Sequence, residues 1–172
     1  MQAELAGATA GFAATVPMTA AMEFMHRMLP AHEQYPLPPR QIVDNAVLKA
    51  DAEQVTPGEP HGGTERRTGL EPREDERAGL ALAAHFAFGA MAGTAYGSIA
   101  RTRPAHPALA GMGYGLLVWV SQYLGVLPAV GVLSNAKDHP ARRNALMIAA
   151  HLVWGAALGT LAHKLVSPSA LR

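Results

Sequence analysis

Apolar and charged positions are segregated into long blocks along this chain. Four stretches contain no Asp, Glu, Lys or Arg: residues 5–22, 78–100, 107–136 and 144–163. Each has about the 17–25 residues that a helix needs to cross a bilayer roughly 30 Å thick. A helix on the surface of a soluble domain would carry a charged face, which these stretches lack. The pattern therefore predicts a single membrane domain with four spanning helices, over about 3–28, 78–100, 107–130 and 141–166.

A long polar loop, residues 30–77, separates the first two predicted spans. Five apolar residues recur within it at helical spacing: Ile42, Val43, Ala46, Val47 and Ala50. They predict a short amphipathic helix over about 40–54, lying on the membrane surface or over the mouth of the bundle. The preceding PLPPR is expected to be stiff and to favour polyproline geometry, because proline fixes φ.

The second and fourth spans repeat one phrase. AAHFAFGAMAGT at 83–94 and AAHLVWGAALGT at 149–160 are identical at seven of twelve positions. The first and third spans share a weaker A-G-x-x-x-G, at 6–11 and 110–115. Because two spans preserve the direction of the chain, the two copies should be parallel and related by an axis along the membrane normal. The sequence thus predicts an all-α, four-helix bundle built from two two-helix repeats.

Glycines recur at a spacing of four in these spans. Residues four apart share one helix face, and GxxxG patterns let helix backbones approach closely in lipid. The glycines predicted to form such contacts are Gly7, Gly11, Gly89, Gly93, Gly97, Gly111, Gly115, Gly155 and Gly159. All fall toward the end of the bundle that carries the termini, so we expect the bundle to be narrow there and open at the other end.

Polar side chains fall at a similar depth near the expected open end. His85 and His151 each follow an arginine by eight residues, which is about 12 Å of helix. Ionisable groups inside a membrane are costly and usually face the interior. The candidates for a polar cavity are Glu23, His26, His85, Trp119, Gln122, Tyr123 and His151. Two plainer alternatives are hydrogen bonding between helices by the histidines and pairing of Glu23 with Arg27 or Arg40 at the interface.

Few cofactor chemistries fit this sequence. The absence of cysteine excludes disulfides and thiolate metal sites. Glu23 and His26 form one E-x-x-H pair, but di-iron bundles need two such pairs and further carboxylates. We therefore predict no metal site and no cofactor, with a haem ligated by His85 and His151 as the alternative. The net charge of +1 gives no reason to expect nucleic acid as a partner, and no nucleophile–base pair indicates an enzyme.

Orientation follows from the basic residues near the spans. Ten Lys and Arg residues lie on the side of the first and third loops and four on the other side. The positive-inside rule then places those two loops in the cytoplasm.

Four motifs resemble those of the YagU-like inner-membrane proteins: PLPPRQIVD at 36–44, HFAFGAMAGTAYG at 85–97, GMGYGLLVW at 111–119 and HLVWG at 151–155. The first of these makes a loop motif of Pro36, Pro38, Pro39, Arg40 and Asp44. The resemblance implies a small multi-pass protein of the bacterial inner membrane, from a family sometimes linked to acid stress. It brings no catalytic residues to this chain.

Three classes of function remain. The first is an accessory or scaffolding subunit in contact with the bilayer. It would dock through its glycine faces into a homo-oligomer or a larger membrane complex. The small size of the chain and the lack of a catalytic constellation favour this class. The second class is a protein that handles protons, ions or small molecules in the polar cavity. The third is an electron-transfer protein with a bis-histidine haem.

Overall fold

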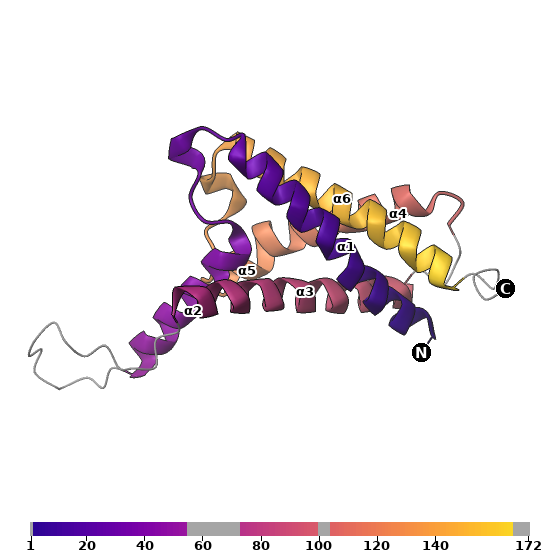
Figure 1. Cartoon of the computed structure of the whole chain (residues 1–172), viewed down its shortest axis with the longest axis horizontal. Coiled ribbons are helices and arrows are strands. Elements are labelled where there is room, and N and C mark those ends of the chain that lie inside the picture. Colours follow the sequence, from indigo (N-terminus) through magenta and orange to yellow (C-terminus); the bar gives the residue numbers. More distant parts are fainter. Residues whose placement is uncertain (1, 55–72, 100–103, 167–172) are drawn as a thin grey trace, which may run out of the picture.

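The computed structural model describes residues 2–54, 73–99 and 104–166, and all regular secondary structure within these ranges is helical (Figure 1). The long helices are α1 (Gln2–Arg27), α3 (Glu74–Ile99), α4 (Pro107–Ser121) and α6 (Ala141–Val166). A π-helical segment, η2 (Gln122–Val126), and the short α5 (Leu127–Ala129) extend α4. The spans formed by α1, α3, α4 to α5, and α6 are long and apolar enough to cross a membrane, which confirms the predicted all-helical membrane fold.

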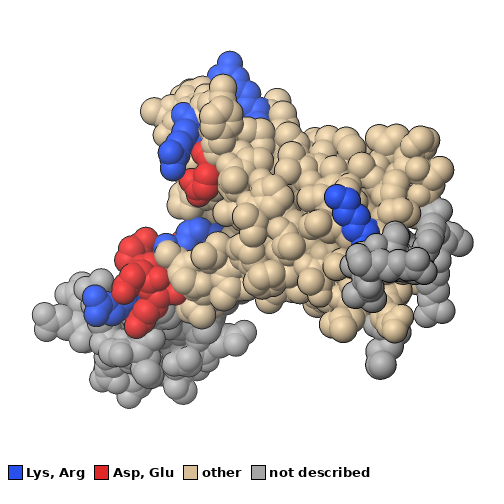
Figure 2. All heavy atoms as spheres, turned by 45° about the vertical axis from the view of Figure 1, so that its right-hand side comes forward, with Lys and Arg blue, Asp and Glu red and all other residues tan. Residues whose placement is uncertain are grey.

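Both ends of the chain lie at the same end of the bundle. Helix α1 begins and α6 finishes there, which we call the terminal end, whereas α2 (Pro38–Gln54) lies at the opposite, loop end (Figure 1). Two 3₁₀ turns, η1 (Ala31–Glu33) and η3 (Ala136–Asp138), also belong to the connections between spans. On the face shown in Figure 2, charged side chains gather at the ends of the molecule and the surface between them is uncharged. That distribution suits a bilayer, whose core penalises charge.

Glycines bring the helices into backbone contact in two pairs, α1 with α3 and α4 with α6. A Cβ added at Gly93 would lie 2.8 Å from the Cα of Gly11, and one added at Gly155 would lie 2.7 Å from the carbonyl carbon of Gly111. Real Cβ atoms do not approach backbone so closely, so these positions accept only glycine without movement of a helix. Eight of the nine glycines named above make such contacts with backbone of the same chain, and at Gly89 the closest atom is the Thr15 hydroxyl oxygen.

The two halves of the bundle differ in how they meet. Along one side α1 packs on α6, and the Trp154 indole donates a hydrogen bond to the Gly11 carbonyl at 3.2 Å. On the other side α3 makes its extensive contacts with α1 and α2 and not with α4. Near the terminal end the Tyr114 hydroxyl donates to the Ala92 carbonyl of α3 at 2.8 Å, and the rings of Tyr96 and Tyr114 lie 5.2 Å apart. Tyrosines therefore join α3 to α4 at that end.

The proline motif before α2 differs from the polyproline segment expected. Helix α2 begins at Pro38, so Pro38 and Pro39 occupy its first turn. Proline is tolerated there because the first N–H groups of a helix have no partner within it, and its fixed φ suits the helix. Arg40 then pairs with Asp44 at 2.9 Å and with Glu74 of α3 at 2.7 Å. The first pair lies within α2, and the second links α2 to the beginning of α3.

Candidate functional site

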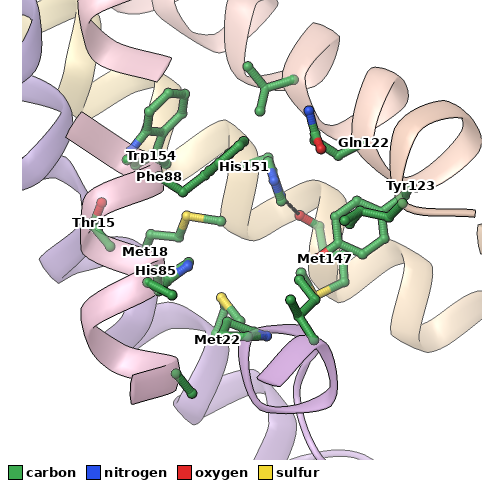
Figure 3. Close-up of a pocket in the computed structure, with 17 residues that line it drawn as sticks. Thr15, Met18, Met22, His85, Phe88, Gln122, Tyr123, Met147, His151 and Trp154 are labelled. Carbon is green, nitrogen blue, oxygen red and sulfur yellow. Dashed lines mark hydrogen bonds between the residues drawn. The ribbon is translucent and has the colours of Figure 1, made fainter. Parts of the chain in front are cut away.

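A cavity of about 260 Å³ lies at the loop end, bounded by side chains from α1, α2, α3, α6 and the third span, α4 to α5 with η2 between them (Figure 3). Its volume is close to the lower limit of the roughly 300–1,000 Å³ typical of small-molecule sites. Most lining residues are apolar. The polar ones are Thr15, His85, Gln122, Tyr123 and His151, and no Asp, Glu, Lys or Arg of the described chain lines it.

The cavity exists because glycine gives way to larger residues along each helix. Toward the terminal end α1 and α3 touch through Gly7, Gly11, Gly93 and Gly97, whereas toward the loop end α1 presents methionines. In the third span, Pro128 has no N–H to donate to the preceding turn, and the chain adopts η2 just before it. Gln122 and Tyr123, both in η2, line the cavity. The span ends at Ala129, and Gly131 follows with φ of 64°, the left-handed conformation that suits glycine after a helix.

His151 is held by its own helix with one ring nitrogen committed. Its Nδ1 lies 2.8 Å from the Met147 carbonyl oxygen, which can only accept a hydrogen bond. In the neutral ring, Nδ1 therefore carries the proton and Nε2 keeps a lone pair. The ring is 5% exposed, and the ring of Tyr123 contacts it edge-on at 5.9 Å between centroids.

His85 lines the cavity from α3 and contains a polar atom without a protein partner. Its Nε2 is buried, and no hydrogen-bond partner for it is found among the described residues. A buried unpaired nitrogen costs free energy unless something else satisfies it. Figure 3 shows His85 and His151 bordering the same space from different helices. The two histidines that head the repeated phrase are thus brought together at one cavity.

Trp119 belongs to the layer behind the cavity wall. It is buried and stacks on Tyr123 with 6.2 Å between ring centroids, but it does not line the cavity. Its Nε1 is also buried and has no partner in the described part of the chain. The Trp119 indole packs on the Tyr123 ring and lies outside the cavity lining.

Glu23 and His26 lie outside the cavity, contrary to the sequence-based expectation that Glu23 faces inward. Met18 and Met22 take the inward positions of α1, and Glu23 follows Met22 by one residue, about 100° further round the helix. The Glu23 side chain is exposed as a result. The Nε2 atom of His26 lies instead 3.1 Å from the carbonyl oxygen of Tyr35, in the loop that follows α1. No three His, Asp or Glu side chains within the described ranges are grouped as metal ligands.

Three methionines of the lining were not singled out from the sequence. Met18 and Met22 of α1 and Met147 of α6 all border the cavity. Their spacing gives a signal in retrospect, because Met18 and Met22 are four residues apart, as are Met147 and His151. Each pair therefore shares one helix face.

Arg143 was counted from the sequence only as a loop charge, yet it anchors the connection that leads to α2. It is 5% exposed and donates hydrogen bonds to three carbonyl oxygens: Glu33 at 2.9 Å, Tyr35 at 2.9 Å and Pro36 at 3.0 Å. Its guanidinium also lies 3.5 Å from the centre of the Tyr35 ring. Because Pro39 and Ile42 of α2 line the cavity, this anchor positions part of its wall.

His139 completes the same anchor. Its Nδ1 lies 2.8 Å from the Tyr35 hydroxyl. Burial, followed by the positive charge of Arg143, lowers the pKa of His139 below its ordinary value. The neutral ring is therefore favoured in the folded protein, and it accepts the hydrogen bond from the hydroxyl.

Comparison with family models identifies the family of this chain. The model of a family described as protein of unknown function, DUF1440, matches residues 27–160. The chain belongs to this family. The match spans the loop motif, the second and third spans and most of α6, so the cavity residues of α2, α3, η2 and α6 lie within it. No curated protein and no solved structure matches the chain.

Proposed function

We propose that this protein holds a small ligand, either an ion or a small molecule, in the cavity at the loop end of its membrane-spanning bundle. The observation that carries the proposal is the buried, unpartnered Nε2 of His85 at the wall of an otherwise mainly apolar cavity. Small-molecule sites have this character, with an apolar wall and a few polar groups that fix the ligand. The function proposed is the binding of a ligand in this cavity.

The packing of the glycines bears on the scaffolding hypothesis. That hypothesis relied on glycine faces that dock on a partner, but all nine glycines contact backbone or side-chain atoms of their own chain. They supply no docking face, and the cavity is the stronger basis for a function. A haem between His85 and His151 is the other candidate for the ligand, and a visible absorption spectrum of the purified protein tests it.

Location in the bacterial inner membrane is part of the same proposal and is supported by the four candidate spans and the YagU-like motifs. With the first and third loops in the cytoplasm, as the basic residues indicate, the cavity would lie nearer the cytoplasmic side of the membrane.

The test is a native mass measurement on the full chain, released from lipid nanodiscs prepared directly from membranes. Wild type should carry a bound mass in addition to the 18.1 kDa chain. Ala84 lines the cavity, so Ala84→Phe should fill part of it and remove that mass. Ala95→Phe is the matched control, because Ala95 is an exposed residue of the same helix outside the cavity. An equal bound mass on all three proteins, or on none of them, would contradict the proposal.

A further inference from the structure

Five side chains with soft or borderline metal-binding atoms border the cavity from three helices. They are the thioethers of Met18, Met22 and Met147 and the imidazoles of His85 and His151. Figure 3 shows these five labelled side chains around one space. The pairs at a spacing of four, Met18 with Met22 and Met147 with His151, each place two of these groups on one helix face.

The two imidazoles offer a metal ion different things: His151 is already oriented by its own helix, and His85 presents an unpartnered nitrogen. A histidine that binds a metal nearly always donates its other ring N–H to a carbonyl or carboxylate, which fixes the tautomer. His151 already makes this bond, from Nδ1 to the Met147 carbonyl at 2.8 Å, and its Nε2 lone pair is left for a ligand. His85 Nε2 is buried without a partner in the described chain. An ion bound between the helices would satisfy this atom.

The ligand atoms and the apolar lining of the cavity indicate which kind of ion it would bind. Ca²⁺ and Mg²⁺ require oxygen ligands, usually carboxylates, and no carboxylate of the described chain lines the cavity. Thioether and imidazole groups together favour Cu(I), a soft ion. A monovalent ion also leaves less uncompensated charge in an apolar surrounding than a divalent one. Methionine side chains are flexible enough to close on an ion from their present rotamers.

We propose that the ligand of this cavity is a single Cu(I) ion, bound by the imidazole nitrogens of His85 and His151 and by methionine thioethers. This inference rests on the proposed function, since it names the ligand of the same site. The sulfur ligands that it names can be removed by substitution, which tests their part in binding separately.

The first experiment is an anaerobic titration of the full chain in lipid nanodiscs with Cu(I), in competition with a chromogenic Cu(I) chelator. We expect one Cu(I) per chain. X-ray absorption of the loaded protein should show both sulfur and imidazole nitrogen around the metal. Ag(I), which does not change oxidation state under these conditions, should compete for the same site, and Mg²⁺ should not.

Methionine variants keep the test separate from folding. The triple variant Met18→Leu, Met22→Leu, Met147→Leu conserves volume and apolar character, and such exchanges are usually well tolerated. It should weaken Cu(I) binding by at least about 100-fold, because loss of an outer-shell partner alone typically costs about 10- to 100-fold. The control is Met28→Leu with Met91→Leu, whose side chains are 71% and 63% exposed and do not line the cavity. The control should bind Cu(I) as wild type does.

The outcomes separate this inference from the proposed function. Failure of wild type to take Cu(I) from the chelator, or equal affinity in the triple and control variants, would overturn the copper assignment. If an organic mass is then bound by wild type and lost in Ala84→Phe, the cavity still holds a ligand of another class. If neither copper nor any other mass is bound, both proposals fail.

Discussion

The close approach of α4 and α6 can be tested with two glycines that lie two residues apart. A Cβ added at Gly111 would lie 2.9 Å from both the carbonyl carbon of Gly155 and the amide nitrogen of Gly159. These are backbone atoms of α6, so they cannot rotate away, and α4 must shift. A Cβ added at Gly113, on the same helix, meets nothing within 4 Å among the atoms of the described chain.

The two substitutions should therefore have clearly different effects on stability. Gly111→Ala should lower the free energy of unfolding by about 3 kcal/mol, the upper part of the usual range for overpacking, because helix backbones and not side chains must move. Gly113→Ala should leave it unchanged or raise it by about 0.5–1 kcal/mol, since alanine is the better helix former. Reversible unfolding in mixed detergent micelles, followed by circular dichroism, measures both values. Equal effects of the two substitutions, in either direction, would refute the proposed helix contact.

Two further predictions concern the anchor formed by Arg143. Arg143→Lys should lower stability by at least about 2 kcal/mol, because one ammonium group cannot replace a buried, planar guanidinium that donates to three carbonyl oxygens. The exposed neighbour Arg142→Lys should stay within about 0.5 kcal/mol of wild type in the same unfolding assay. Because the pKa of His139 is lowered in the folded protein, its contribution to stability is present above the unfolded value of about 6.5 and is lost as pH falls. The melting temperatures of wild type and His139→Asn should therefore become more alike as the pH is lowered from 8 to about 5. A difference that stays constant over this range would contradict a lowered pKa for His139.

The fold could be predicted from the sequence because lipid imposes simple rules. Long stretches without charge have to be helices in a bilayer, and the glycine spacing in each span indicates where backbones meet. The sequence also indicated which end of the bundle would be narrow. The glycines lie early in α1 and late in α3, and because the two helices run in opposite directions, both sets lie at the same end of the bundle. The contacts of Gly11 with Gly93 and of Gly111 with Gly155 follow this pattern.

The site was only partly predictable, because its residues were chosen from the sequence by their polarity. The two histidines and Gln122 and Tyr123 were found, since polar groups in a span attract attention. Glu23 was a cavity candidate with the interface as its alternative, because an acid near the end of a span can face either. The structure leaves it exposed and outside the cavity. The methionines of α1 and α6 were missed because they look like any other apolar residues. Nothing local to Arg143 shows that it pairs with carbonyls more than 100 residues earlier.

Ligand binding in the cavity is tested most directly by a crystal structure of the full chain, grown from a lipid mesophase without added ligand or chelator. We expect α3 and α4 to stay apart at the loop end, with density between His85 and His151 that the protein atoms do not explain. A structure in which α3 closes on η2, so that His85 Nε2 finds a protein partner and the cavity disappears, would contradict it.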